Sequence, residues 1–297
     1  MVDQRLVEKC LGVNFGKLNY ITHLDDTRNL VYVETPKVAC TSIKKLMMDQ
    51  YIGELLELPT TSSVHDRNTS PLKQISRLTT NEALSLWSPT HRRFSFVRNP
   101  FSRCLSGYLD KIVTNEYERK RHLPMLGFAP DCQPSLLEFL KKLQQIPDRD
   151  RDVHFTTQSA LLMIDVVEYD FIGRFENFKR DFLQLQRSYY DLEHPYVAYE
   201  RFGKHHASSA NEKVCEFFGE PEAALVREIY RKDFESFGYS YKLDDASKVE
   251  DPVGTADRVH RRWNDRLASA QRRHRQLNAM RRTVKLIKNV FKFPGAL

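Results

Sequence analysis

A run of small and hydroxyl-bearing residues follows a strand-like segment between Val33 and Lys45, where the sequence reads VETPKVACTSIKK. Small residues after a strand let the backbone turn tightly and direct successive N–H groups to one point, and the next helix adds the positive end of its dipole. Lys37 adds a mobile positive charge, and two hydroxyls add further donors. This pattern predicts an anion-binding loop at the start of a helix. Its residues are Lys37, Val38, Ala39, Cys40, Thr41 and Ser42.

The same loop residues have interpretations that need no anion chemistry. A strand that stops at Pro36 and a helix that begins with a Thr41 cap are common structural devices. The loop also differs from the Walker sequence GxxxxGK[ST], because its lysine precedes the turn. That order argues against a nucleoside triphosphatase or a small-molecule kinase. Cys40 is interpreted as a small packing residue and not as a nucleophile activated by the helix end.

A second candidate anion contact lies in the segment FVRNPFSRCLSGY, residues 96–108. Arg98 stands at the end of a strand-like run, and Ser106 follows eight residues later on the expected helix. Arginine grips phosphate through two parallel N–H donors, and a serine hydroxyl completes such a contact. A loop for one phosphate and an Arg/Ser pair for another predict a nucleotide with phosphates at two separate positions. The alternative interpretation is that Arg98 is an ordinary surface arginine and Ser106 an ordinary helix serine.

Strands alternate with helices along the chain, which predicts an α/β fold with a mainly parallel sheet. Runs of β-branched and aromatic residues predict strands over 29–35, 92–100 and 166–176. Residues 1–28 are expected to be a lead-in, and residues 59–81 a loop. Helical periodicity predicts helices over 41–58, from Pro100 onward, over 134–146, after residue 176 through Leu185, and over 212–218 and 221–239.

Together, the two stretches resemble the sulfotransferases that use 3′-phosphoadenosine 5′-phosphosulfate (PAPS). The closest similarity is to the carbohydrate branch, which includes the chondroitin 4-O and HNK-1 enzymes. Its P-K-x-x-C-T and R-x-P-F-x-R-x-x-S-x-Y segments occur here in the same order, about 60 residues apart. The resemblance covers about residues 30–240, although some members have Trp where this chain has Phe155. Three further segments are similar: RDRDVHFTTQ (149–158), YDFIGRFENFKRDF (170–183) and IYRKDFESFGYS (229–240).

The resemblance implies a P-loop-like three-layer fold in which a central, mainly parallel sheet is flanked by helices. It also implies transfer of a sulfuryl group from PAPS, as co-substrate, to an acceptor hydroxyl or amine without a metal ion. In the family, the loop holds the 5′-phosphosulfate and the Arg/Ser pair holds the 3′-phosphate. Lys37 is therefore expected to neutralise the leaving phosphate, while Arg98 and Ser106 anchor the other end of the donor.

His154 is the first candidate for the base that takes the acceptor proton. An ordinary histidine pKa near 6.5 suits this task, and the segment around His154 resembles the family's. A structural histidine bonded to the backbone is the alternative. Glu176 is the second candidate base, although an ion pair with a neighbouring arginine is the preferred interpretation. The loop GKHHASSAN (203–211) is interpreted either as a cover over donor or acceptor, or as a solvated polar loop.

The positive charge of the 297-residue chain is concentrated near its C-terminal end. Residues 258–292 hold twelve Lys and Arg residues and one acid, whereas the rest holds 34 basic and 38 acidic residues. We expect a sulfotransferase domain over 1–240, a polar linker over 241–256 and a basic amphipathic helical tail over 257–297. The tail is expected to contact an anionic membrane surface or an acidic polymer, to pack on the body or in a homo-oligomer, or to be disordered. No motif predicts specific nucleic-acid binding.

Five scattered cysteines without a CxxC pair argue against a zinc site or a disulfide framework, and no apolar run is long enough to span a membrane. Golgi members of the resembled family carry an N-terminal anchor that this sequence does not show. We therefore expect a cytoplasmic enzyme, peripheral to the membrane if the tail binds lipid. The acceptor is expected to be a glycan hydroxyl. Sulfation of a lipid or small metabolite, and a nucleotide-binding scaffold without catalysis, are the alternatives.

Overall fold

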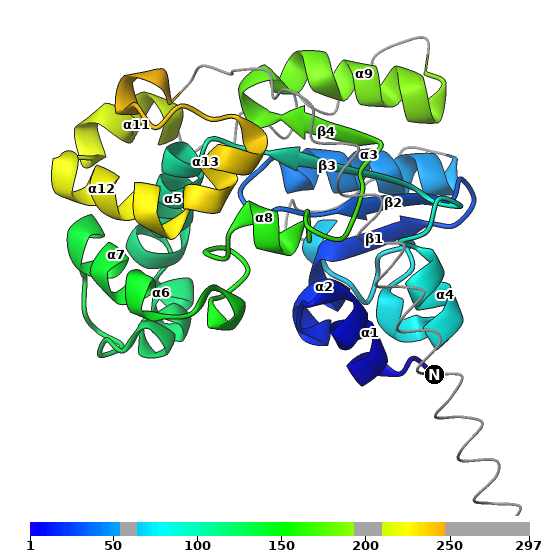
Figure 1. Cartoon of the computed structure of the whole chain (residues 1–297), viewed down its shortest axis with the longest axis horizontal. Helices are drawn as coiled ribbons and strands as arrows, with labels where there is room; N and C mark the ends of the chain where they lie inside the picture. Colours follow the sequence, from blue (N-terminus) through cyan, green and yellow to red (C-terminus); the bar gives the residue numbers. More distant parts are fainter. Residues whose placement is uncertain (54–63, 193–209, 247–297) are drawn as a thin grey trace, which may run out of the picture.

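The sheet at the centre of the molecule has four strands in the order β1–β2–β3–β4 (Figure 1). The computed structural model describes residues 1–53, 64–192 and 210–246. β1 (Thr22–Asp25) pairs antiparallel with β2 (Leu30–Val33), and β3 (Arg92–Val97) and β4 (Phe171–Arg174) extend the sheet in parallel. The prediction of an α/β fold with a mainly parallel sheet is therefore confirmed.

Helices lie around the sheet (Figure 1). Before β1 and between β2 and β3 they are α1 (Gln4–Leu11), α2 (Phe15–Ile21), α3 (Cys40–Ile52) and α4 (Thr80–Ser85). Between β3 and β4 they are α5 (Pro100–Tyr108), a π-helix (Leu109–Thr114), α6 (Glu116–His122), α7 (Leu136–Gln145) and α8 (Gln158–Leu161). After β4 they are α9 (Phe178–Tyr190), α11 (Ala210–Phe217), α12 (Glu220–Ile229) and α13 (Arg231–Phe237). Short 3-10 turns lie at Ile75–Arg77, Pro124–Leu126, Asp148–Asp150, Phe175–Asn177 and Leu243–Asp245.

Two hydrophobic cores, one on each face of the sheet, hold the helices in place. Side chains alternate across a strand, so Tyr32 of β2 packs in one core while Val31 and Val33 pack in the other. The Tyr32 core also contains residues of α3 and α9, and the Val31 core contains residues of α1, α2, α5, α7 and α12. Helices, sheet and helices thus form the three layers that the family resemblance implied.

Each parallel strand leads at its carboxyl end toward a helix: β2 toward α3, β3 toward α5 and β4 toward α9. In sheets of this kind, ligands bind in the crevice outside these strand ends. The Thr35 hydroxyl after β2 donates to the Phe96 carbonyl of β3. Glu176 after β4 accepts a hydrogen bond from the backbone N–H of Asn99 after β3, at 2.7 Å. The three strand ends are thus tied together, and the residues that follow them are held near one another.

Glycine and proline have specific roles beside this crevice. Pro100 is at the first turn of α5, as predicted, and Asn99 caps that helix through the Phe101 N–H at 3.0 Å. Gly173 of β4 is the register partner of Phe96, and a Cβ atom at position 173 would overlap the Phe96 ring. The absence of a side chain at Gly173 therefore lets β4 pack against the bulky β3.

The lead-in expected over residues 1–28 is wrong, because this part of the chain forms α1, α2 and the edge strand β1. The signals for the two helices were in the sequence. Asp3 and Asn14 cap their N-termini, and Gly12 ends α1 with a left-handed φ of 74°. The helix α6 was also not predicted, although Asn115 caps it in the same way.

Several predicted elements are longer than the observed ones. The helix predicted over 41–58 begins at Cys40 and ends at Ile52, because Gly53 takes a left-handed φ of 83°. The strands β2, β3 and β4 are also shorter than the predicted ranges 29–35, 92–100 and 166–176, because each ends before the residues that lead into the crevice. Residues 203–209 of the polar loop, most of the linker and the whole tail 257–297 lie outside the described residues. Among the described helices, none combines the length and the apolar character needed to cross a bilayer.

Candidate active site

The loop after β2 has the backbone of an anion cradle. Lys37 and Ala39 both have left-handed φ angles, 73° and 53°, which non-glycine residues rarely adopt. Ala39 is the N-cap of α3 and has no side-chain group that bonds to the first N–H groups of the helix. These donors and the positive end of the helix dipole therefore face the loop. Thr41 lies inside α3, which begins at Cys40, so the interpretation with a threonine cap is wrong. The Thr41 hydroxyl lies 3.0 Å from Nε2 of His65.

Arg98 lies directly behind this loop. Its Nη1 donates to the Lys37 carbonyl at 3.1 Å, its Nε donates to the Ser102 hydroxyl at 3.0 Å, and its guanidinium carbon is 4.3 Å from the centre of the Phe175 ring. Burial lowers the pKa of Arg98 to about 10, so the guanidinium keeps its charge at neutral pH. Ser106 is one turn beyond Ser102 on the same face of α5. The structure therefore brings Arg98 to the loop and aligns the buried Ser106 with it.

Arg103 connects the loop with the segment that contains His154, and the sequence analysis did not single it out. Its Nε donates to the Pro36 carbonyl at 3.1 Å, while its two terminal nitrogens donate to the carbonyls of Thr156 and Val153 at 2.8 and 3.3 Å. The side chain is fully buried. A signal was present, because Arg103 is the second arginine of the segment FVRNPFSRCLSGY.

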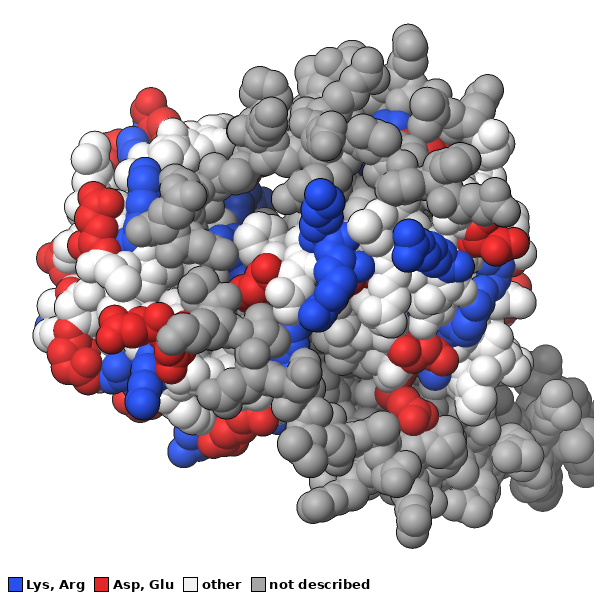
Figure 2. All heavy atoms as spheres, turned by 90° about the horizontal axis from the view of Figure 1, so that it is seen from above, with Lys and Arg blue, Asp and Glu red and all other residues white. Residues whose placement is uncertain are grey.

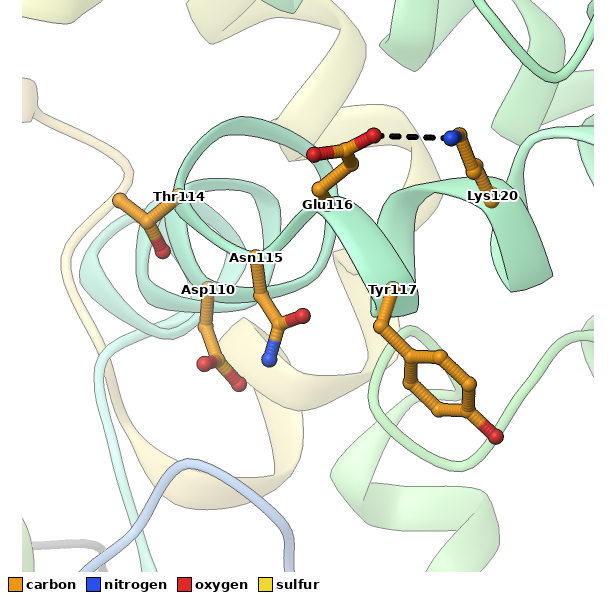
Figure 3. Close-up of a pocket in the computed structure, with 6 residues that line it drawn as sticks. All are labelled: Asp110, Thr114, Asn115, Glu116, Tyr117 and Lys120. Carbon is orange, nitrogen blue, oxygen red and sulfur yellow. Dashed lines mark ion pairs between the residues drawn. The ribbon is translucent and has the colours of Figure 1, made fainter.

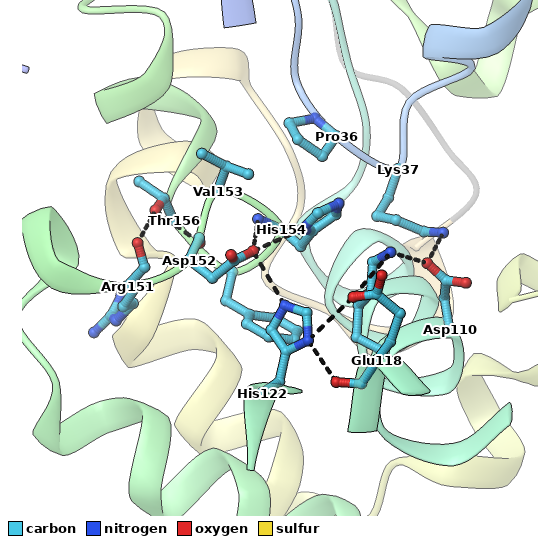
Figure 4. Close-up of polar contacts among 12 residues, drawn as sticks. Pro36, Lys37, Asp110, Glu118, His122, Arg151, Asp152, Val153, His154 and Thr156 are labelled. Atoms are coloured by element: carbon cyan, nitrogen blue, oxygen red, sulfur yellow. Dashed lines mark hydrogen bonds and ion pairs between the residues drawn. The ribbon is translucent and has the colours of Figure 1, made fainter. Parts of the chain in front are cut away.

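His154 is held by a carboxylate. Its Nδ1 lies 2.6 Å from Oδ1 of Asp152, and the same oxygen accepts the backbone N–H of His154 at 2.9 Å (Figure 4). Nδ1 therefore carries the proton, and Nε2 is the basic nitrogen. Burial lowers the pKa of His154 below its ordinary value, despite the opposing charge of Asp152, so the ring is neutral at pH 7. This is the arrangement that a general base requires.

A second histidine, His122 of α6, lies beside Asp152. Its Nε2 is 3.6 Å from Oδ1 of Asp152, and its Nδ1 donates to the backbone carbonyl of Glu118 at 2.8 Å. Burial alone would raise the pKa of Asp152, but its interactions with His122 and His154 lower it below its ordinary value. Asp152 is therefore ionised and available to stabilise a positive charge on His154.

Asp110 faces the loop from the π-helix that continues α5. Its Oδ2 lies 3.0 Å from Nζ of Lys37 and 3.2 Å from Nζ of Lys111, which in turn is 3.8 Å from the carboxylate of Glu118. Glu118 is also 3.4 Å from Nδ1 of His122, so polar contacts run from Lys37 to the histidines (Figure 4). π-Helical turns are frequent at functional sites, and here the turn places two charged residues at the mouth of the loop.

Glu176 connects two strand ends. Its carboxylate accepts hydrogen bonds from the Asn99 N–H at 2.7 Å and from the Tyr239 hydroxyl at 3.0 Å. The charges of Glu176 and of the neighbouring Arg98 attract each other. The interpretation of Glu176 as the ion-pair partner of an arginine therefore stays a prediction. Burial raises the pKa of Glu176 above its ordinary value. Its role as the second candidate base stays a prediction.

The segment IYRKDFESFGYS (229–240) contributes Asp233, which helps to hold Arg98 in position. The Asp233 carboxylate accepts the backbone N–H groups of Gln158 and Ser159, at 2.8 and 2.7 Å, where α8 begins. The Gln158 side chain donates to the Arg98 carbonyl and accepts from the Arg98 N–H, both at 2.8 Å. The position of Arg98 is thus fixed through Gln158 by a residue of α13.

Two groups of side chains bring ligand-type atoms within 4.8 Å of one another: Glu34, Cys40 and His65, and His122, Asp152 and His154. In the first group, Nζ of Lys44 already lies 3.1 Å from Glu34 and 2.7 Å from Nδ1 of His65. Burial, together with the charge of Glu34, raises the pKa of Cys40 to about 12. Cys40 is therefore a protonated thiol at neutral pH, which suits packing rather than nucleophilic chemistry. The expected absence of a metal stays a prediction.

Sequence comparison decides between the classes of protein that bind such an anion. A model of the sulfotransferase family matches residues 22–240. This chain belongs to the sulfotransferase family. The matched range begins with β1 and includes the anion loop, the Arg/Ser pair and both candidate bases. No solved structure matches the chain significantly.

Similar proteins carry the name carbohydrate sulfotransferase. Human carbohydrate sulfotransferase 8 is 26% identical over 251 residues, which are 75% of this chain and 56% of that protein. Mouse carbohydrate sulfotransferase 11 is 28% identical over 252 residues, 75% of this chain and 68% of that protein. Carbohydrate sulfotransferase 10 of Xenopus laevis is 23% identical over 245 residues, with 73% and 66% of the two chains covered. This sulfotransferase thus spans little more than half the length of the human relative.

Proposed function

We propose that this sulfotransferase transfers a sulfuryl group from PAPS to a hydroxyl group of a glycan. The observation that carries the proposal is the cradle at Lys37 and Ala39, which touches the buried Arg98 through the 3.1 Å bond to the Lys37 carbonyl. Two anion contacts on neighbouring elements suit a nucleotide with phosphates at both ends. The similarity to proteins named carbohydrate sulfotransferases supports a glycan as the acceptor.

The residues present fit the donor. The backbone N–H groups of residues 38–42 and the first turn of α3 would hold its 5′-phosphosulfate end. Arg98 and Ser106 would hold the 3′-phosphate and distinguish PAPS from nucleotides without that group. When bound, PAPS supplies a sulfuryl group on a good leaving phosphate. Its arrangement in line with the acceptor oxygen is then set by these contacts at its two ends.

Lys37 acts on the leaving phosphate, and His154 acts on the acceptor hydroxyl. A bond forms between the acceptor oxygen and sulfur as the bond from sulfur to the phosphate oxygen breaks, and the electron pair stays on the phosphate. Lys37 and the loop N–H groups stabilise that growing charge. The acceptor proton moves to Nε2 of His154, and Asp152 stabilises the imidazolium that forms.

We also propose a cytoplasmic location, in which the tail 258–292 meets an anionic membrane surface or an acidic polymer. All five cysteines lie in the described ranges and are free, which suits a reducing compartment. The test is cell fractionation of the full chain beside a variant whose tail lysines and arginines are replaced by glutamine. Recovery of the chain from a secretory compartment would contradict the location.

Calorimetric titration with adenosine 3′,5′-bisphosphate, beside 5′-AMP and ATP, tests the donor site. We expect micromolar binding of the bisphosphate and much weaker binding of the other two nucleotides, because only the bisphosphate engages both anion contacts. Equal binding of 5′-AMP and the bisphosphate would show that Arg98 and Ser106 do not read the 3′-phosphate, and the proposal would fall.

Transfer of labelled sulfate from PAPS to glycans tests the reaction itself. Lys37→Met keeps the length of the side chain and removes its charge, so we expect turnover to fall about a hundredfold or more. The bisphosphate titration of this variant is the control for donor binding, and a thermal melt is the control for folding. Turnover close to that of the unmodified protein would remove Lys37 from the mechanism.

A further inference from the structure

An open pocket (Figure 3) is lined by Asp110, whose carboxylate lies 3.0 Å from Nζ of Lys37, the lysine that is proposed to face the leaving phosphate. Its volume is about 710 Å³, a size typical of sites for small molecules. The described part of its wall comes from the π-helix, the residue after it and α6. The lining residues are Asp110, Thr114, Asn115, Glu116, Tyr117 and Lys120.

Asp110 connects this pocket with the reacting centre. Its carboxylate belongs to the wall and also lies 3.0 Å from Nζ of Lys37. A molecule in the pocket would therefore lie next to the transferred group. The residues assigned to the donor, namely Arg98, Ser106 and the loop 38–42, are not in the described wall. The pocket is thus placed for the acceptor, the second substrate of the proposed reaction.

The chemistry of the wall suits a sugar ring. Tyr117 is 76% exposed, and few large apolar side chains of the described chain are displayed to this extent. An aromatic ring offers a flat apolar face that packs against the C–H groups on one face of a sugar. Asn115, Thr114 and Asp110 add an amide, a hydroxyl and a carboxylate to the same wall, and such groups together donate and accept the hydrogen bonds of sugar hydroxyls.

The charges of the wall favour an uncharged sugar. Lys120 is the one cation in the described wall, and its Nζ lies 2.8 Å from the carboxylate of Glu116. The remaining acid, Asp110, is paired with Lys37 and Lys111. A uronate or a sulfated sugar would therefore find no unpaired lysine in the described wall, whose own charged residues sum to −1 (two acids and one lysine). Figure 2 shows a different face, seen from above, on which the described basic and acidic side chains are interspersed.

We propose that the pocket binds the acceptor glycan through a neutral sugar that stacks on Tyr117, rather than through a charged sugar of an anionic polysaccharide. This inference rests on the proposed function, because it assigns a site and a specificity to the acceptor of that reaction. It makes Tyr117 a specificity-determining residue and the Glu116–Lys120 pair a polar edge of the site.

Binding measurements on the full chain, saturated with adenosine 3′,5′-bisphosphate, test the pocket without requiring turnover. The two probes are a neutral oligosaccharide that ends in N-acetylhexosamine and a chondroitin oligosaccharide of equal length. We expect the neutral probe to bind about tenfold more tightly, and Tyr117→Ala to weaken its binding by about tenfold. Tyr117→Phe keeps the ring and should bind as before. Met125→Ala, which removes an exposed side chain outside the described wall, is the matched control.

Each other outcome overturns the inference in a recognisable way. Tighter binding of chondroitin would contradict the charge argument, and unchanged binding by Tyr117→Ala would remove the stacking residue. If Tyr117→Ala weakened binding of the bisphosphate itself, the pocket would belong to the donor. If the unmodified chain bound the bisphosphate but neither oligosaccharide, the acceptor site would be wrong while the donor site of the proposed function stood. Failure to bind the bisphosphate would instead count against the proposed function.

Discussion

The ammonium group of Lys37 lies 3.0 Å from the carboxylate of Asp110, although 73 residues separate them in the sequence. Lys37 comes from the loop after β2, and Asp110 comes from the π-helix that continues α5. Because both side chains are only partly buried, the pair lies at the mouth of the cradle. An anion that enters the cradle must therefore compete with Asp110 for the charge of Lys37.

Asp110→Asn should strengthen the binding of adenosine 3′,5′-bisphosphate by about three- to tenfold, because one negative charge is removed from beside the phosphate. The gain should shrink at high salt, which screens partly exposed charges. Calorimetric titration at two salt concentrations measures both effects. Asp165→Asn, which breaks an exposed ion pair with Lys232, is the matched control. Weaker binding by Asp110→Asn would instead mean that Asp110 holds Lys37 in its binding position.

The sequence could locate site residues that stand beside strand ends. Lys37 and Arg98 each follow a strand, and Ser106 lies within the same motif as Arg98. Asp110 and Asp152 carry no such signal, because the fold alone brings them to Lys37 and His154 in usable geometry. Asp152 is only two residues before His154 in the sequence. The 2.6 Å bond between their side chains nevertheless depends on a turn, and hydrophobic periodicity does not predict that turn.

The sheet could be predicted where burial on both faces leaves an apolar run. LVYV in β2 is such a run, whereas RRFSFV in β3 includes the buried polar residues Arg93 and Ser95 among its apolar ones. The edge strand β1 reads THLD, in which three of the four residues are polar, yet all four residues are buried. His23 is buried because it bonds to Glu34 at 2.8 Å, and Asp25 because it accepts bonds from Thr27 and Arg28. Hydrogen-bonding partners thus allow the polar residues of β1 to be buried, and these partners cannot be identified from the strand's own sequence.

The pH dependence of turnover should identify His154 as the base. A base must be unprotonated, so activity should fall as the pH drops through the pKa of His154, which burial places below 6.5. Asp152 raises that pKa, so Asp152→Asn should move the acidic limb of the kcat/KM profile to lower pH. The same change should lower kcat about ten- to a hundredfold, because the imidazolium loses its partner.

Two variants separate this role from a structural one. Asp150→Asn removes an exposed carboxylate in the same segment and should leave the profile unchanged. His154→Ala should abolish the acidic limb and retain bisphosphate binding. If the limb persisted in His154→Ala with near-normal turnover, the base would be another group, such as Glu176. A fall in rate for Asp152→Asn without a shifted limb would leave Asp152 a purely structural residue.

Cys40 should resist alkylation. With a pKa of about 12, only about one Cys40 side chain in ten thousand is a thiolate at pH 8, and the thiolate is the reactive form. Treatment of the folded chain with iodoacetamide, followed by peptide mass spectrometry, should modify the exposed Cys215 and leave Cys40 intact. Cys40→Ser should keep sulfate transfer within about threefold, since the thiol takes no part in the proposed chemistry. Rapid labelling of Cys40 would contradict the protonated thiol.

Lys44 and Glu34 form a buried ion pair behind the cradle, and breaking it should be costly. Their charged atoms are 3.1 Å apart, and the two side chains are only 4% and 2% exposed. Lys44→Met leaves the Glu34 carboxylate buried without its main counter-charge, so the free energy of unfolding should fall by about 3–5 kcal/mol. Equilibrium unfolding in urea measures this change.

A pair at the surface gives the matched comparison for Lys44→Met. Glu116 and Lys120 are 2.8 Å apart but 67% and 52% exposed, so Lys120→Met should leave the free energy of unfolding nearly unchanged. The double variant Glu34→Gln with Lys44→Met removes both buried charges and should recover part of the lost stability, because the penalty comes from the unpaired carboxylate. Equal losses in Lys44→Met and Lys120→Met would show that burial does not determine the cost, and that Glu34 reaches water once Lys44 is gone.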